Sequence, residues 1–424
     1  MPNARREFLD QWGDHGDAVI VDTPKPWRLV LWEAAQYVPS WDLGGDVWFT
    51  PEWFETASAE DHQCYEPIMD KECRYTRAGI VEGGPARARV EWSYALCDNR
   101  YRVFNGNSTA DEQYAVYPDG IAVRRLTGWP GDESAHGLNP VYWEVGEFIL
   151  ITGPGVGPDQ ALEPTCFTFM NTSGDEIRCE WPEMFGQDPS GVPPLCVSHP
   201  EIVEWDAYIG VVHLKDRPNV FIAVPHDPKL FPYAACSTCG APHPEFKPFP
   251  GGRSYAHWPA NPTTDFVGWT QATPEDTVAR PSHTSFVTFG YSYGGETPRR
   301  GSSWVYLTGA IEGDDLGPLR DTVRGWLNPG TVRTNHLWNG FAYSERAHKI
   351  LRLSDEPYQI RIETDGPIVR PVFGFDTAFR VAEVRRGEAA LPPDAYRWHT
   401  YQGETVLWLD IQAEKQLDVE VVPE

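Results

Sequence analysis

The segment 253–258 reads Arg-Ser-Tyr-Ala-His-Trp and carries side chains that can run acid–base chemistry. In an extended chain, side chains alternate between two faces, so Arg253, Tyr255 and His257 share one face. An arginine neutralises a uronic-acid carboxylate through paired hydrogen bonds, and His257 or Tyr255 can then move the protons of a β-elimination. The alternative is that the tyrosine and the histidine pack under a loop. Further candidates are His283 for catalysis and Trp258 and His336 for substrate binding.

Two pairs of carboxylates suggest a different reaction, because glycoside hydrolysis needs an acid and a base or nucleophile about 5–10 Å apart. Glu66 and Asp70 are four residues apart, and Arg74 and Tyr75 follow them. We expect these four residues to contact substrate if the pair is functional. The second pair is Glu144 and Glu147, beside Trp143. In an acidic chain such pairs also arise by chance and are then solvated or bound to arginine.

A third motif, Cys236-Ser-Thr-Cys239, is followed by His243. Two cysteines in a C-x-x-C turn and a nearby histidine suit zinc, and we expect such a zinc to be structural. The usual second C-x-x-C is absent, so a fourth ligand has to come from afar, with His226 and His257 as candidates. Two free thiols or a disulfide are the alternatives. No organic cofactor is expected.

Composition limits the possible partners. The chain has 424 residues, 18 of them Trp, and its net charge is -26. Nucleic acids and anionic membranes need clustered lysine and arginine, which are missing here, so we exclude both as partners. No apolar run is long enough for a transmembrane helix. The segment before Asp17 lacks the apolar stretch of a signal peptide, which predicts a cytoplasmic protein, or a secreted one if an export signal has been removed. In the secreted case Cys64 and Cys73 would be candidates for a disulfide.

Short runs rich in Val, Ile, Tyr and Trp, separated by turn residues, predict a mainly β fold. In the run 86–92, Ala86, Ala88, Val90 and Trp92 share one face and the charged residues share the other. The turn Pro118-Asp119-Gly120 joins two strands of a hairpin. The spacing of apolar residues predicts one clear helix near 315–327, and residues 4–12 a second, short one. Further strands are expected at 27–32, 147–152, 166–170, 208–214, 220–224, 282–293 and 303–308, with 381–384, 405–411 and 417–421 in a terminal module.

Two stretches resemble a known group of proteins. Residues 64–75 read Cys-Tyr-Glu-Pro-Ile-Met-Asp-Lys-Glu-Cys-Arg-Tyr, and residues 111–124 contain Asp-Glu-Gln-Tyr and Tyr-Pro-Asp-Gly-Ile-Ala-Val-Arg. They resemble bacterial β-sandwich proteins of a mutarotase-like type that are associated with glycan breakdown and are largely uncharacterised. The resemblance covers about residues 27–295. It implies the fold and a glycan or oligosaccharide substrate, and it assigns no catalytic residue.

These observations predict a large antiparallel, mutarotase-like β-sandwich at 1–340 and a small C-terminal β-sandwich module at 341–424. The function that we expect first is a lyase that cleaves a uronic-acid-containing glycan or oligosaccharide. A glycoside hydrolase that uses paired carboxylates is the second, and a glycan-binding protein without catalysis is the third. The sequence does not predict the oligomeric state, the sugar or the linkage.

Overall fold

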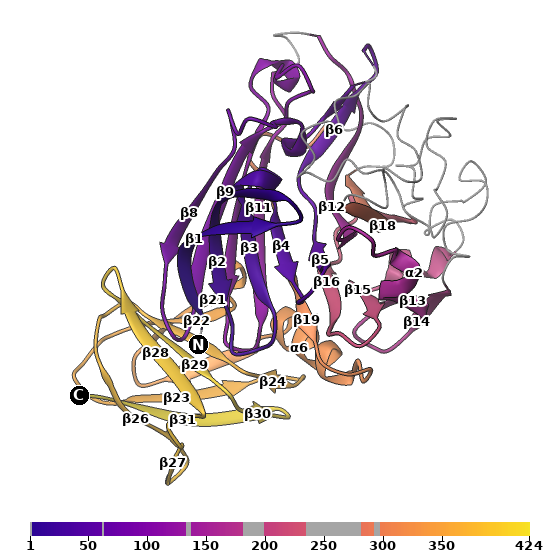
Figure 1. Ribbon diagram of the computed structural model, residues 1–424. Helices are drawn as coiled ribbons and strands as arrows, with labels where there is room; N and C mark the ends of the chain where they lie inside the picture. The colour runs from indigo at the N-terminus through magenta and orange to yellow at the C-terminus, as the bar shows by residue number, and fades with distance from the viewer. Residues whose placement is uncertain (1, 62, 133–136, 181–198, 235–280, 292–296) are drawn as a thin grey trace.

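The computed structural model describes residues 2–61, 63–132, 137–180, 199–234, 281–291 and 297–424 (Figure 1). Strands dominate these residues, and they form two large sheets, two five-stranded sheets and the two-stranded sheet β24-β30. The prediction of a mainly β protein, with a large antiparallel sandwich and a smaller C-terminal β module, is confirmed.

The first large sheet holds the N-terminal strands and the long strand β12. In the described part of the chain its order is β1-β2-β3-β4-β5-β12-β18-β17, with β6 paired to both β12 and β7. Neighbouring strands run antiparallel. The bounds are β1 (Asn3–Gln11), β2 (Asp14–Asp22), β3 (Arg28–Trp32), β4 (Pro39–Asp42), β5 (Val47–Thr50), β6 (Glu55–Ser58), β7 (Cys64–Tyr65), β12 (Pro140–Thr152), β17 (Leu230–Ala234) and β18 (Ser282–Tyr291).

The second large sheet packs its inner face on the first. Its order among the described strands is β14-β13-β15-β16-β19-β11-β10-β9-β8. Apolar side chains from both sheets, such as Leu31, Trp92, Phe148 and Phe167, fill the space between them. The bounds are β8 (Arg77–Glu82), β9 (Ala88–Ala95), β10 (Thr109–Val116), β11 (Ile121–Trp129), β13 (Leu162–Met170), β14 (Glu176–Glu180), β15 (Ala207–Leu214), β16 (Asn219–Pro225) and β19 (Ser302–Ile311).

Two smaller sheets form the C-terminal module, with the orders β20-β23-β31-β26-β27 and β21-β22-β25-β29-β28. The pair β22 and β25 is parallel, and the other pairs of these sheets are antiparallel. The expected boundary at residue 341 falls inside β21. The bounds are β20 (Thr331–Thr334), β21 (Leu337–Ala342), β22 (Ala347–Leu351), β23 (Tyr358–Glu363), β24 (Ile368–Val369), β25 (Val372–Phe375), β26 (Val381–Arg386), β27 (Ala389–Ala390), β28 (Tyr396–Tyr401), β29 (Glu404–Leu409), β30 (Gln412–Ala413) and β31 (Gln416–Pro423).

The predicted helix near 315–327 is α6 (Gly317–Leu327). Leu319, Val323 and Trp326 are buried in an apolar cluster between the sandwich and the C-terminal module (Figure 1). The Asp315 carboxylate accepts a hydrogen bond from the Gly317 backbone N–H at 2.9 Å. The other described helices are short: α2 (Pro158–Ala161) and the 3₁₀ turns Glu33–Ala35, Pro67–Met69, Phe104–Gly106, Pro200–Glu204 and Tyr343–Glu345.

The helix that we expected at residues 4–12 is wrong, because this segment is strand β1. It forms a hairpin with β2, in which Gln11 pairs with Asp14. Both connecting residues, Trp12 and Gly13, have positive φ, as a two-residue hairpin turn requires. Glycine supplies this geometry readily, so Gly13 was the signal for a turn. Cys64 and Cys73 are both free thiols, so the candidate disulfide is also wrong.

The expected alternation along 86–92 holds from Arg87 to Trp92 but is wrong for Ala86, which belongs to the apolar cluster on the side of the C-terminal module. Ala88, Val90 and Trp92 are buried in the sandwich core. Arg87 is fully buried as well, on the opposite face of β9, where the C-terminal module covers the sheet. Its guanidinium binds Glu82 at 2.9 Å and Glu345 of the module at 2.7 Å.

Candidate functional site

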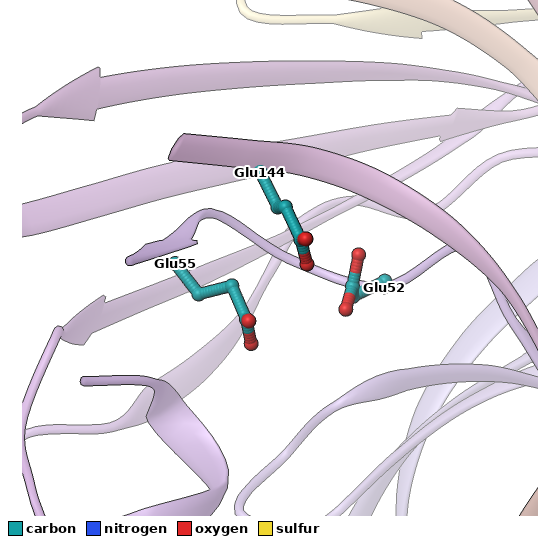
Figure 2. A group of neighbouring side chains, drawn as sticks. All are labelled: Glu52, Glu55 and Glu144. Carbon is teal, nitrogen blue, oxygen red and sulfur yellow. The ribbon is translucent and has the colours of Figure 1, made fainter. Parts of the chain in front are cut away.

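Four segments bring five glutamates together beside the first sheet. Glu52 lies in the loop after β5, Glu55 begins β6, Glu66 follows β7, and Glu144 and Glu147 belong to β12. Glu144 pairs directly with Glu55 across the β6–β12 ladder, which fixes the register of the site. We call these five residues the carboxyl cluster. Figure 2 shows the carboxyl groups of Glu52, Glu55 and Glu144 converging from their three segments.

The carboxyl groups of the cluster touch one another. One oxygen from each of Glu52, Glu55 and Glu144 lies within 4.8 Å of the other two. Glu55 is at the centre, since it shares hydrogen bonds with both Glu66 and Glu144, while Glu52 shares one with Glu147. Glu144 is partly exposed and the other four are buried, so the cluster meets solvent at Glu144.

Two neutral side chains donate hydrogen bonds to the Glu55 carboxylate. The Trp53 Nε1–H donates to Glu55 Oε2 at 2.8 Å, and the Tyr142 hydroxyl donates to Glu55 Oε1 at 3.1 Å. Hydrogen bonds to a carboxylate stabilise its ionised form. The two donors, together with Glu66 and Glu144, therefore favour negative charge on Glu55.

The backbone around the cluster is held by a buried ion pair. Arg124 of β11 binds both carboxylate oxygens of Glu112 at 2.8 Å. Its Nη1 also donates to the carbonyls of Pro51, at 3.1 Å, and Val145, at 3.3 Å. Arg124 thus ties the loop that precedes Glu52 to the strand that carries Glu144.

Irregular backbone geometry directs the glutamate side chains toward one another. Glu52 has a φ of 59°, an uncommon conformation for a residue with a side chain. Its N–H donates to the Thr50 hydroxyl at 3.2 Å. The ladder between β12 and β18 shifts register between Glu144 and Glu147, and again after Glu147. A β-bulge redirects side chains, which explains how Glu144 and Glu147, three apart in one strand, both reach the cluster.

Burial changes the acidity of these groups. Burial and the neighbouring glutamates raise the pKa of Glu52, Glu66 and Glu144 well above 4.5. Burial also raises the pKa of Glu55, but the hydrogen bonds that it accepts oppose this increase. Among Glu52, Glu55, Glu66 and Glu144, Glu55 is thus the one whose hydrogen bonds with Glu66 and Glu144 favour its own ionised form.

Two other ionisable residues border the cluster. Burial lowers the pKa of Lys71 to about 8, although nearby Glu66 counteracts this. Lys71 is thus the closest source of positive charge that acts on Glu66. Burial and the glutamates raise the pKa of Cys64 well above 9.0, and its Sγ lies 3.3 Å from the Tyr142 hydroxyl. A thiol of this kind is neutral and a poor nucleophile.

Three of the glutamates also meet the minimum geometry for a hard cation. Carboxylate oxygens suit Ca²⁺ and Mg²⁺, and Glu52, Glu55 and Glu144 offer three converging oxygens. Oε2 of Glu52 is buried and has no hydrogen-bond partner. A cation would require all three groups to be ionised, whereas the hydrogen bond between Glu55 and Glu144 requires a shared proton. The geometry fits both states: a cation held by three ionised groups, or a cluster that shares protons.

The structure describes only some of the residues that we predicted from the sequence to be functional. The lyase residues Arg253, Tyr255, His257 and Trp258, and the zinc ligands Cys236, Cys239 and His243, lie outside the described residues. His283 is described only by its backbone, which pairs with Ile151 in the β12–β18 ladder. Of the two carboxylate pairs, the structure brings Glu66, Glu144 and Glu147 together and leaves Asp70 out.

The contacts of Asp70 indicate a structural role. It is fully buried, and its carboxylate accepts hydrogen bonds from the backbone N–H groups of Arg74, Tyr75 and Thr76 at 2.7–3.0 Å. The Arg74 side chain is exposed, binds Glu72 at 2.8 Å and lies over the ring of Tyr101. The Tyr75 hydroxyl donates to the Tyr101 carbonyl at 2.9 Å. These contacts hold the surface loop after Asp70 in place.

His336 lies in the C-terminal module and is buried there. Its Nδ1 accepts a hydrogen bond from the Leu353 N–H at 3.1 Å, and its Nε2 lies 3.2 Å from the Glu356 carbonyl. Its ring packs on Tyr358 with centroids 4.2 Å apart. With both nitrogens satisfied, His336 supports the loop before β23.

Sequence reasoning missed Glu52 and Glu55. Their signal was the segment Pro51-Glu-Trp-Phe-Glu55, in which two acidic residues closely follow the fully buried strand β5. A buried strand that leads into paired glutamates places them beside a core, where isolated charge is costly. Nothing in the spacing along the chain links them to Glu144, because that contact arises from strand pairing.

Comparisons with known proteins do not assign this chain to a family. No protein-family model matches the chain, and no curated protein matches it. One solved structure found is galactose 1-epimerase from Lactobacillus acidophilus NCFM, at 8% sequence identity and a TM-score of 0.29, over 74% of this chain and 99% of that one. A similarity at this level supports no conclusion about function. Among the described residues, no helix is long and apolar enough to cross a membrane.

Proposed function

We propose that this chain is a carbohydrate-active enzyme that hydrolyses a glycosidic bond at the carboxyl cluster. The observation that supports this most is the contact between two unlike glutamates: Glu55, where accepted hydrogen bonds oppose the rise in pKa, and Glu144, whose pKa burial raises well above 4.5. Glycoside hydrolysis uses this combination of one protonated and one ionised carboxyl group. The resemblance of residues 64–75 and 111–124 to proteins of glycan breakdown supports the same substrate class.

The two groups take different roles in this proposal. Glu144 is the general acid that protonates the leaving oxygen, since it is the member of the cluster that meets solvent. Glu55 is the nucleophile or base, because Trp53 and Tyr142 stabilise its negative charge. Glu66 supplies a further hydrogen bond to Glu55, and Arg124 holds the backbone on which these residues sit.

The test uses a panel of oligosaccharides and two readouts. We expect new reducing ends from the wild-type chain, and a loss of turnover of about two to four orders of magnitude in Glu144→Gln and Glu55→Gln, the usual worth of a positioned acid or base. Glu388→Gln is the matched control, because this glutamate is exposed in the C-terminal module. Unchanged turnover in both cluster variants would eliminate the proposal. Ultraviolet absorbance from an unsaturated uronate would instead establish the β-elimination that segment 253–258 predicts.

The spacing of the two carboxyl groups leads to a second expectation. Glu55 and Glu144 share a hydrogen bond, so their carboxyl groups are closer than the about 5–5.5 Å of retaining enzymes and much closer than the about 6.5–9.5 Å of inverting ones. A bound sugar has to part them, and the retaining separation needs the smaller movement. We therefore expect the product to keep the anomeric configuration of the substrate. Proton NMR of the first product, recorded before mutarotation, measures this directly, and an inverted anomer would show that Glu55 is not the nucleophile.

A further inference from the structure

A groove of about 650 Å³ lies on the outer face of the second sheet, away from the carboxyl cluster. Its walls come from the start of β10, the end of β11 and the turn before β19. Residues that matter for its chemistry are Asn107, Thr109, Asp111, Trp129, Asp132 and Arg300. None of them has a role in the proposed hydrolysis.

Strand alternation shows that Trp129 faces outward. Leu126 and Ala122 of β11 belong to the core between the sheets, so Trp129, Thr127 and Arg125 occupy the opposite face. On β10, Thr109 pairs with Trp129, and Asp111 pairs with Thr127, so both lie on this outer face. The indole is partly exposed at the groove.

The second sheet separates this groove from the carboxyl cluster. Phe54, which precedes Glu55, packs against Gly128 from the inner side, where a Cβ on Gly128 would lie 2.9 Å from the Phe54 ring. Phe54 also stacks on Trp143 of β12. Trp129 follows Gly128 and points the other way, so a ligand on its indole cannot reach the carboxyl groups of the cluster.

The backbone on both sides of Trp129 is fixed, which makes the indole a rigid surface. The Ser108 hydroxyl donates to the Trp129 carbonyl at 3.0 Å, and the Gly301 N–H donates to the Gly128 carbonyl at 2.9 Å. Gly301 has a φ of 76°, and a Cβ there would contact Trp129 Nε1 at 3.7 Å. Glycine at this position therefore keeps the edge of the indole open.

Two polar groups of the groove, on Arg300 and Asp111, are available to a ligand. Within the described part of the chain, Arg300 makes no hydrogen bond or ion pair, and neither does the Asp111 carboxylate. Asn107 is already engaged, because its Oδ1 accepts the Asp132 N–H at 3.0 Å and so shapes the turn. The groove thus offers one flat aromatic face, one free cationic donor and one free anionic acceptor.

We propose that this groove is a second sugar-binding site, which takes a neutral oligosaccharide with one pyranose ring stacked on Trp129. The C–H face of a pyranose carries positive partial charge and suits the electron-rich face of an indole. Arg300 and Asp111 provide a donor and an acceptor for vicinal hydroxyl groups, the small set of polar contacts typical of a ligand site. Arg125 acts on Asp111 from the same face, so Asp111 and Asp132 are balanced by Arg125 and Arg300, and the groove has no excess positive charge to attract an acidic sugar. The inference goes beyond the proposed hydrolysis, because no bond is cleaved here.

Isothermal titration of the full chain with neutral gluco-, galacto-, manno- and xylo-oligosaccharides tests the site, with an oligouronate as the acidic probe. We expect at least one neutral sugar to bind, and Trp129→Ala to weaken that binding by at least about tenfold, while Trp129→Phe retains part of it. Trp398→Ala, a partly exposed tryptophan of the C-terminal module, is the control and should bind as wild type.

The outcomes separate this site from the hydrolytic one. Glu144→Gln should keep the Trp129-dependent binding even though it loses turnover, and a melting temperature within the wild-type range confirms that Trp129→Ala is folded. The proposal is overturned if no neutral sugar binds, if Trp129→Ala binds as tightly as wild type, or if only the oligouronate binds. Each of these results leaves the proposed hydrolysis to its own test.

Discussion

Burial of acidic residues in the carboxyl cluster lowers the stability of the fold, but it also gives these residues the pKa values that acid–base chemistry needs. Glu52 is buried against Glu147, Glu55 and Glu144, and one of its oxygens has no hydrogen-bond partner. An isolated buried charge is costly, so a buried acid takes up a proton instead. The same effect that keeps Glu144 protonated for catalysis makes the folded chain bind more protons than the unfolded chain does.

This proton uptake predicts how stability depends on pH. Because the pKa of Glu52, Glu66 and Glu144 is raised above 4.5 by burial, the folded state holds protons that the unfolded state has released. The contribution of these three residues to stability is therefore highest below the unfolded value near 4.5 and falls as pH rises through their folded values. We expect Glu52→Gln to raise the free energy of unfolding at pH 8 by about 1–2 kcal/mol, and to raise it much less at pH 5. Urea titrations at the two pH values measure this. An equal change at both would show that Glu52 is ionised in the folded state.

At the scale of elements, strand β11 positions the site through Arg124. Its guanidinium is buried with Glu112 and donates to the carbonyls of Pro51 and Val145. Arg124→Met should destabilise the chain by about 3–5 kcal/mol, since Glu112 is left buried without its partner. The double variant Arg124→Met, Glu112→Met should recover much of this loss, because the uncompensated charge is gone.

Turnover measurements separate the positioning role of Arg124 from the contribution of the Arg124–Glu112 pair to folding stability. The double variant lacks the two carbonyl contacts, so we expect turnover to stay low even where the free energy of unfolding returns toward wild type. Chemical denaturation and turnover on the same preparations separate the two effects. Full activity in the double variant would show that Arg124 only stabilises the fold.

The sequence predicted the secondary-structure elements better than it predicted the candidate site. Local patterns predicted the hairpin at Pro118-Asp119-Gly120 and helix α6, because turn chemistry and helical spacing are local. The burial of Arg87 was missed, since it depends on a module more than 240 residues later in the chain covering β9. Likewise, Glu55 and Glu144 meet only through β6–β12 pairing, and no local pattern reports that contact.

At the scale of the whole molecule, the C-terminal module is joined to the sandwich by apolar and ionic contacts. Tyr117 and Leu307 of the sandwich share an apolar cluster with Trp326 of α6 and Trp408 of the module. The Tyr117 hydroxyl donates to the Glu345 carbonyl, and Arg346 binds buried Asp119 at 2.7 Å. Because apolar and ionic contacts both join them, we expect the two parts to unfold as one unit.

The ion pairs at this interface remain charged over a wide pH range. Burial by itself would raise the pKa of Glu345, but Arg87 and Lys349 outweigh burial and lower it to about 2. A carboxylate with a lowered pKa stabilises the fold above its unfolded value of 4.5, and this contribution is lost as pH falls toward 2. The contact between Glu345 and Arg87 therefore helps to hold the module in place at neutral pH, and this contribution is lost only as pH falls toward 2.

Removing Arg87 should loosen the coupling between the sandwich and the C-terminal module. Arg87 compensates both Glu82, which is fully buried, and Glu345, and His399 of the module contacts Glu82 at 2.7 Å from the other side. We expect Arg87→Met to cost about 3–5 kcal/mol, as a broken buried pair usually does, and to split the single calorimetric transition into two. Arg333→Met is the matched control, because its ion pair with Glu363 lies on the surface of the module. A single, merely shifted transition in Arg87→Met would mean that the apolar cluster around Trp326 couples the two parts without help from the ion pairs. The residual coupling would then be removed by Trp326→Ala and not by acid.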